Sequence, residues 1–249
     1  MKGAGCKTEY FLVKELAGDF HAKSGVRMQV GGTGNKKAVE LMREGKIDFA
    51  FTCKPIERLA KKLGLGEEVS SWSSTPIAMD PIVVVASPEV GVENLTSGQL
   101  TGIFKGDITN WRDVGGADLP VMPAYMSESL ESGVVLLFKE FTVGVKERLA
   151  PKAMIANGPS MLGNYTSVTP GAVTFMGLNS YREKYGKILA IDGVSPTREN
   201  IVAGRYGLAA TYYLTTKPES PAAVQQFLDF TRSVEGRAAI NRNFVSLER

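Results

Sequence analysis

The stretch "GGTGNKKAVELMREGKIDFAFTCKP", Gly31 to Pro55, decides the fold because it passes from loop to helix to strand. It opens on a glycine-rich loop and continues as a helix that Gly45 is suited to end. The helix carries an apolar stripe formed by Ala38, Leu41 and Met42. The strand that follows alternates apolar residues at Ile47, Phe49 and Phe51.

Helix and strand patterns alternate along the rest of the chain. A first helix has one apolar face and is expected to stop at Gly25; the face consists of Leu12, Val13, Leu16, Ala17 and Phe20. The continuous apolar runs at 81–87 and 171–178 are typical of strands covered on both faces. A further helix face is formed by Val134, Leu137, Phe138 and Phe141. This order predicts an α/β protein with largely parallel sheets.

Composition excludes several classes of protein. The chain has 249 residues, a net charge of +3 and no dense Lys/Arg cluster, which argues against a nucleic-acid partner. No apolar run approaches the roughly 20 residues of a membrane span. A single histidine, His21, disfavours zinc sites and Ser-His-Asp or Cys-His enzymes. The first residues lack the apolar stretch of a signal peptide, so the protein is either cytosolic or begins after a removed export signal.

The loop of Gly31 to Gly34 is a candidate anion site. Glycine lets a backbone approach a ligand closely, and the free N–H groups of a helix start attract anions. Asn35 and two lysines follow directly. The alternative is a tight turn with solvated lysines. Polar loops of similar form precede the helices that begin near residues 10 and 134, and their convergence would make a small-ligand site.

Several motifs resemble the periplasmic solute-binding proteins of ABC importers, specifically the phosphate-binding protein branch. The resemblance rests on five stretches: the loop, helix and strand of 31–55, "LTSGQLTGIFKGDITNWRDVGG" (95–116), "TPGAVTFMGL" (169–178), "DGVSPTRENIVAGRYGLAATYYLTTK" (192–217) and "AVQQFLDFTRSVEGRAAI" (223–240). It implies a type 2 fold of two α/β lobes joined by two crossover strands, with the ligand between the lobes. Lobe one would be residues 1–80 plus 200–249, and lobe two residues 81–199.

The same resemblance implies which residues bind the ligand. They are Cys6, Lys7, Thr8, Gly32, Thr33, Gly34, Asn35, Thr52, Cys53, Lys54, Ser132 and Gly133. The family's arginine before the last loop is missing, because no arginine lies between Pro120 and Ser132, and Glu128 and Glu131 stand there instead. Either lysines and helix starts hold an oxyanion, or the site takes a zwitterionic, cationic or neutral ligand. A further alternative is that the glutamates are solvated and point away.

Cys6 and Cys53 fall in loops that, by the resemblance, lie side by side. Three interpretations stay open: a disulfide in an oxidising compartment, a pair of small buried fillers, or part of a soft-metal site. We expect no cofactor and no metal, and we expect that the protein is not an enzyme.

Two functions fit this pattern. The first is an extracytoplasmic receptor that hands a small ligand, such as phosphate, to an ABC permease. The second is a sensory or regulatory module of the same fold, with another ligand and a membrane sensor as its partner. An enzyme with a cysteine nucleophile is disfavoured because no base is placed near either thiol.

Overall fold

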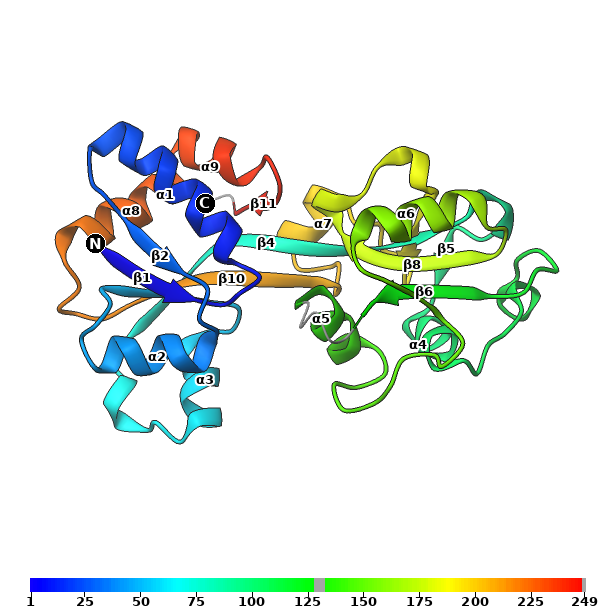
Figure 1. The fold of residues 1–249 in the computed structure, drawn as a ribbon, viewed down its shortest axis with the longest axis horizontal. Helices are drawn as coiled ribbons and strands as arrows, with labels where there is room; N and C mark the ends of the chain where they lie inside the picture. The colour runs from blue at the N-terminus through cyan, green and yellow to red at the C-terminus, as the bar shows by residue number, and fades with distance from the viewer. Residues whose placement is uncertain (128–132, 248–249) are drawn as a thin grey trace. The chain divides into compact units, whose positions relative to one another are not determined.

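The computed structural model describes residues 1–127 and 133–247, which fold as two compact units (Figure 1). The first unit contains Met1–Asp80 and Ala210–Arg249, and the second contains Pro81–Ala209. The chain passes from one unit to the other within β4 (Ser73–Ala86) and at the start of β10 (Ala209–Thr216).

The first unit is a sheet with helices on both faces. Its other strands are β1 (Lys2–Gly5), β2 (Gln29–Gly31), β3 (Phe49–Thr52) and β11 (Val245–Ser246). β1 runs parallel to β2 and to β3, while β10 pairs with β3 in the antiparallel sense. Its helices are α1 (Tyr10–Ser24), α2 (Asn35–Arg43), α3 (Ile56–Leu63), α8 (Ala222–Arg232) and α9 (Val234–Ile240).

Each face of this sheet has its own apolar core. In Figure 1, α1, α8 and α9 cover one face and α2 and α3 cover the other. Phe49 and Phe51 pack with the first group of helices, and Ala50 packs with the second. β3 is therefore buried at every position, although its sequence predicted alternation. The two phenylalanines do share a face, but the opposite face is covered as well.

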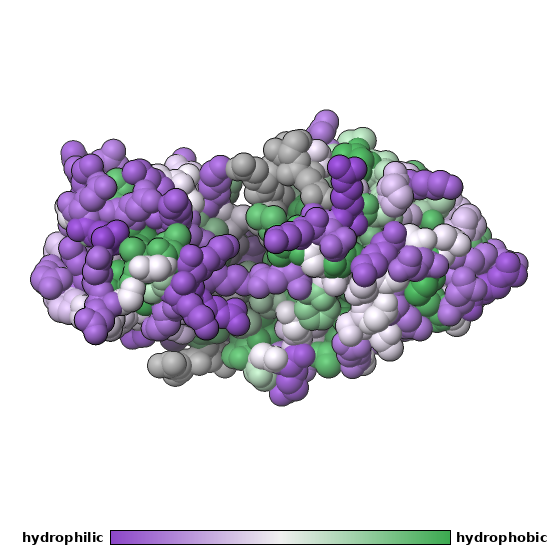
Figure 2. All heavy atoms as spheres, turned by 90° about the horizontal axis from the view of Figure 1, so that it is seen from below, coloured by the Kyte–Doolittle hydropathy of each residue, from purple (hydrophilic) through white to green (hydrophobic). Residues whose placement is uncertain are grey.

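The helices α2 and α3 turn charged residues to solvent. Figure 2 shows this side of the first unit as mostly hydrophilic, with one small apolar island. The exposed residues of the two helices are all charged: Lys36, Lys37, Arg43, Glu57, Arg58, Lys61 and Lys62. Met42, next to Arg43, is buried. In the described part of the chain, no helix is long and apolar enough to cross a membrane.

The second unit is also a sheet between helices. The second half of β4 pairs with β8 (Ala172–Gly177) and β9 (Lys187–Ile191), and β6 (Met122–Met126) runs parallel to β8. The remaining strands are β5 (Asn94–Leu95) and β7 (Met154–Ala156). The helices are α4 (Ser97–Lys105), α5 (Gly133–Phe141), α6 (Pro159–Val168) and α7 (Arg198–Val202).

Aromatic rings join α4 and α5 to this sheet. The rings of Phe138 and Phe175 stack with centroids 3.6 Å apart, and Phe104 meets both edge-on. Leu162 of α6 belongs to a separate cluster with Val83 and Val85 of β4. The sheet of the second unit thus also has a core on each face.

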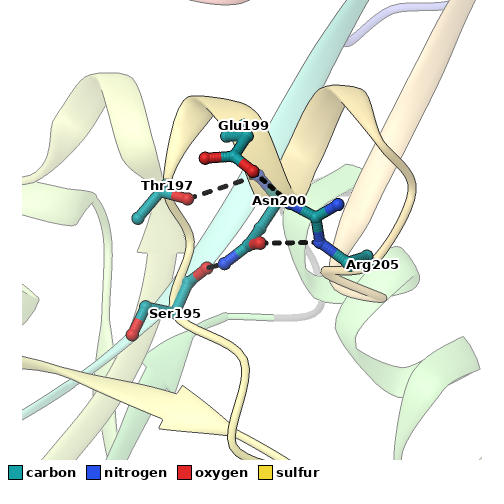
Figure 3. Close-up of polar contacts among 5 residues, drawn as sticks. All are labelled: Ser195, Thr197, Glu199, Asn200 and Arg205. Atoms are coloured by element: carbon teal, nitrogen blue, oxygen red, sulfur yellow. Dashed lines mark hydrogen bonds and ion pairs between the residues drawn. The ribbon is translucent and has the colours of Figure 1, made fainter.

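Residues 200–209 belong to the second unit, whereas the predicted boundary assigned them to lobe one. Arg205 follows α7 and donates hydrogen bonds of 2.8 Å each to the side chains of Glu199 and Asn200, near the start of the helix, as Figure 3 shows. The Tyr206 hydroxyl donates to the Ile82 carbonyl at 2.7 Å. The Arg205 contacts are internal to this segment, whereas the Tyr206 bond joins it to Ile82 of β4 within the second unit.

Candidate functional site

The loops that follow β1, β2 and β3 meet at one edge of the first unit. These strands are parallel, so their carboxyl ends lie at the same edge, where α/β proteins bind ligands. The Gly34 amide donates to the Gly5 carbonyl at 2.7 Å, and the Cys6 amide donates to the Phe51 carbonyl at 2.8 Å. The backbone itself therefore fastens the three predicted loops of this unit together.

Two glycines of the second loop are required by geometry. A Cβ on Gly32 would lie 3.3 Å from the Cβ of Tyr10, so this glycine lets the loop approach the start of α1. Gly34 has a φ of 85° and precedes α2, in a conformation that L side chains rarely adopt. Asn35 is the first residue of α2, as expected, and Thr33 is exposed beside it.

The two cysteines lie at the centre of this edge. Their sulfur atoms are 2.8 Å apart and hydrogen-bonded, and both thiols are free. The hydroxyl of Thr8 lies 3.0 Å from the Cys6 sulfur. The Asn35 amide donates to the Cys53 sulfur at 3.1 Å, and its carbonyl accepts from the Cys53 backbone at 3.4 Å. Residues of all three loops thus form one polar cluster.

The surroundings separate the acidities of the two thiols. The hydrogen bond with Cys53 lowers the pKa of Cys6 to about 6, against the opposing effect of burial. The same hydrogen bond, together with burial, raises the pKa of Cys53. Of the two thiols, Cys6 is therefore the one that loses its proton more readily.

Buried carboxyl groups accompany the thiols, and one of them was missed at the sequence level. Glu9, beside Cys6 in the chain, is fully buried, and its two carboxyl oxygens have no hydrogen-bond partner among the described residues. Burial raises the pKa of Glu9 well above its usual value, and the charge of Cys6 adds to the effect. A charged residue directly before an apolar helix face was the only available signal.

Asp80 and Tyr212 form the inner boundary of this cluster. The Tyr212 hydroxyl donates to Asp80 Oδ2 at 2.7 Å, while Asp80 Oδ1 has no partner in the described part of the chain. Burial raises the pKa of Asp80 to about 6, although the hydrogen bond from Tyr212 acts in the opposite direction. Burial also raises the pKa of Tyr212. Tyr212 carried no sequence signal, since its partner is far away in the chain.

Lysines supply the positive charge near the edge. Lys7 is exposed in the first loop, and Lys54 is half-buried after Cys53. Lys37 points along α2 to Glu40, with a distance of 3.4 Å between the charged atoms. Lys7 and Lys54 are thus the lysines that the loops themselves carry.

The structure does not bring every predicted residue to this edge. Thr52 is fully buried, and its hydroxyl bonds that of Thr215 at 3.2 Å, so we leave its side chain out of the proposed site. Gly133 begins α5 in the second unit. Ser132, Glu128 and Glu131 lie outside the described residues.

Among residues 1–127 and 133–247, no group of three or more His, Cys, Asp or Glu side chains could hold a metal ion. The contact of 2.8 Å between the sulfurs is compatible with the disulfide and the filler interpretations. The three interpretations of the thiols stay predictions.

An α/β unit with glycine loops, helix starts and polar side chains at the carboxyl edge of parallel strands defines a class of small-ligand-binding proteins. Comparison with known proteins identifies the family. Residues 1–235 match the PBP superfamily domain, and the chain therefore belongs to this family.

Curated relatives carry phosphate in their names. The chain is 23% identical over 215 residues to the phosphate-binding protein PstS of Bacillus subtilis, covering 86% of this chain and 68% of the relative. It is 27% identical over 182 residues to PstS of Borreliella burgdorferi, covering 69% of this chain and 64% of that one. The match to the second relative therefore spans less than two thirds of its length.

Solved structures share the fold. PstS from Borrelia burgdorferi superposes with a TM-score of 0.83 at 21% identity, covering 100% of this chain and 99% of that one. A putative phosphate ABC transporter substrate-binding protein with bound phosphate, from Clostridium perfringens, gives 0.72 at 21% identity, covering 100% and 99%. The predicted two-lobed α/β fold is confirmed.

Proposed function

We propose that this chain is an extracytoplasmic receptor that binds phosphate or another small oxyanion and hands it to an ABC permease. The fold, the family and the names of its relatives support this function. In this proposal the protein binds one ligand without converting it, as a receptor rather than an enzyme.

The observation that carries the proposal is the joined edge of the first unit. It presents backbone N–H groups at the start of α2, the hydroxyl of Thr33, and the cations of Lys7 and Lys54. Helix starts and cations are favourable for an anion, and hydrogen bonds to a charged group are the stronger kind.

Calorimetric titration of the purified, ligand-stripped protein with phosphate at low salt tests the function. Sulfate, molybdate and tungstate follow as competing oxyanions. We expect Lys54→Gln to weaken phosphate binding about tenfold or more, since a hydrogen bond to a charged group contributes about 1.5–3 kcal/mol. Lys62→Gln, in the last turn of α3, is the matched control with the same change of charge.

Phosphate binding that weakens in Lys54→Gln and is retained in Lys62→Gln would support the proposal. Equal loss in both variants would mean that only net charge attracts the anion. No binding of any oxyanion, in either the oxidised or the reduced protein, would refute the proposed function.

A further inference from the structure

We propose that Cys6 and Cys53 form a reversible disulfide that switches the loop edge from a reduced state, in which its donors are bound to sulfur, to an anion-accepting state. The disulfide stands on the geometry of the thiols, and its effect on the ligand rests on the proposed function. The pair joins the loop after β1 to the loop after β3, 47 positions apart in the chain.

The loops already hold the thiols in place for this bond. The sulfur atoms are 2.8 Å apart, and a disulfide brings them to about 2.05 Å, so little movement is needed. The Cys6 amide bonds the Phe51 carbonyl, which fixes the distance between the two strand ends. No large rearrangement separates the reduced and oxidised forms.

The exposure of the thiols sets the order of the reaction. Cys53 is half-buried and Cys6 is buried, so a small external disulfide, such as oxidised glutathione, meets Cys53 first. The proton of Cys53 passes to Cys6 across their hydrogen bond, and the Cys53 sulfur attacks that disulfide and releases one glutathione thiolate. That thiolate takes the proton from Cys6, whose sulfur then attacks the Cys53 sulfur and displaces the second glutathione thiolate. Two electrons pass to glutathione, one disulfide is broken and one is formed.

Oxidation changes what the edge offers an anion. In the reduced form the Thr8 hydroxyl and the Asn35 amide are hydrogen-bonded to sulfur. A disulfide sulfur carries no charge and is a weak acceptor, so both groups become available to an oxyanion. Oxidation also removes the more acidic thiol of the pair, Cys6, whose thiolate would repel an anion held within a few ångströms. The oxidised protein should therefore bind the anion more tightly.

The first measurement is the state of the thiols. The protein is incubated with oxidised glutathione, and its intact mass and free thiols are compared with those of the reduced protein. We expect both thiols to disappear together with a loss of about two mass units and no glutathione adduct. In Cys53→Ser the remaining Cys6 has no partner for an internal disulfide. This variant should keep the Cys6 thiol and should not lose the two mass units. Thiols that stay free, or that only form glutathione adducts, would overturn the disulfide.

The second measurement is phosphate titration of both forms. We expect the oxidised form to bind at least about tenfold more tightly than the form kept in dithiothreitol, as removal of one nearby charge predicts. The double variant Cys6→Ser, Cys53→Ser should show no dependence on dithiothreitol. Equal affinity of the two forms would overturn the coupling. Binding by neither form would refute the proposed function, while the thiol count would still decide the disulfide.

Discussion

Two polar regions, the segment around Trp111 in the second unit and the thiol edge of the first, differ in how completely their polar groups are paired. Thr96 and Gln99 cap each other at the start of α4, and the Trp111 indole donates to the Gly171 carbonyl at 2.8 Å. At the thiol edge, Glu9 and Asp80 keep carboxyl oxygens without a partner among the described residues. Native proteins rarely leave buried polar groups unpaired, and those that do often serve function.

We infer that the segment around Trp111 mainly supports folding and that the thiol edge supports binding. Fully paired polar groups stabilise one conformation, and their loss is costly. Unpaired, buried carboxyl groups make folding less favourable at high pH, and a protein retains them where a ligand or a chemical change uses them. Mutations in the two regions should therefore have effects of different size and even of different sign.

Trp111→Ala should have the largest effect. The indole is fully buried and hydrogen-bonded, and truncation of a large core side chain costs about 3–5 kcal/mol of unfolding free energy. Denaturant unfolding measures the loss. Val168→Ala, at a side chain that is 79% exposed, is the control and should stay within about 0.5 kcal/mol. A loss of unfolding free energy below about 1 kcal/mol in Trp111→Ala would contradict the inference that this paired segment stabilises the fold.

Glu9→Gln should change the pH dependence of stability. The folded pKa of Glu9 lies well above its ordinary value of 4.5, so its favourable contribution is present below 4.5 and is lost as the pH rises through the folded pKa. Relative to the wild type, the variant should gain stability over that range, by about 1.4 kcal/mol per pH unit at most. Urea unfolding from pH 4 upward measures the difference.

The matched control is Glu57→Gln, in the exposed first turn of α3. Its unfolding free energy should stay within about 0.5 kcal/mol of the wild type, because the side chain is exposed. If the difference in unfolding free energy between Glu9→Gln and the wild type did not change with pH, the Glu9 carboxyl would be paired in solution. The thiol edge would then be as fully paired as the segment around Trp111.

Arg205→Lys should have the smallest effect on unfolding free energy. It tests polar groups that are paired but exposed to solvent. Arg205 is about half exposed and Glu199 is 86% exposed, so the ion pair between them contributes at most about 1 kcal/mol. We expect a change in unfolding free energy of about 0.5 kcal/mol. A loss as large as that of Trp111→Ala would show that α7 depends on this network as the core depends on its aromatic residues.

The order of helices and strands could be predicted from the sequence, because it depends on local periodicity. α1 ends before Gly25, and its buried residues are those of the predicted face. α5 spans the other predicted face, but its buried residues are Val135, Phe138 and Lys139, so only Phe138 is shared with the prediction. The meeting of the loops after β1, β2 and β3 was also predictable, by resemblance and because parallel strands place their carboxyl ends together.

What could not be predicted depends on contacts between distant residues. Thr52 lies on a strand buried on both faces, so alternation could not show that its hydroxyl meets Thr215. The carboxyl of Glu9 is buried by the packing of the whole unit, and its position in the sequence resembles that of a solvated helix start. The pKa of Cys6 depends on a thiol 47 positions away.

The first unit is assembled from both ends of the chain, and this has a consequence for synthesis on the ribosome. Residues 1–80 emerge early, but β10, α8 and α9 come from residues 209–240. The whole of the second unit, 81–209, is translated between them. Domains generally fold as units during synthesis. The second unit should therefore fold first. The loops that carry Cys6 and Cys53 should remain incompletely covered until α8 and α9 have been synthesised.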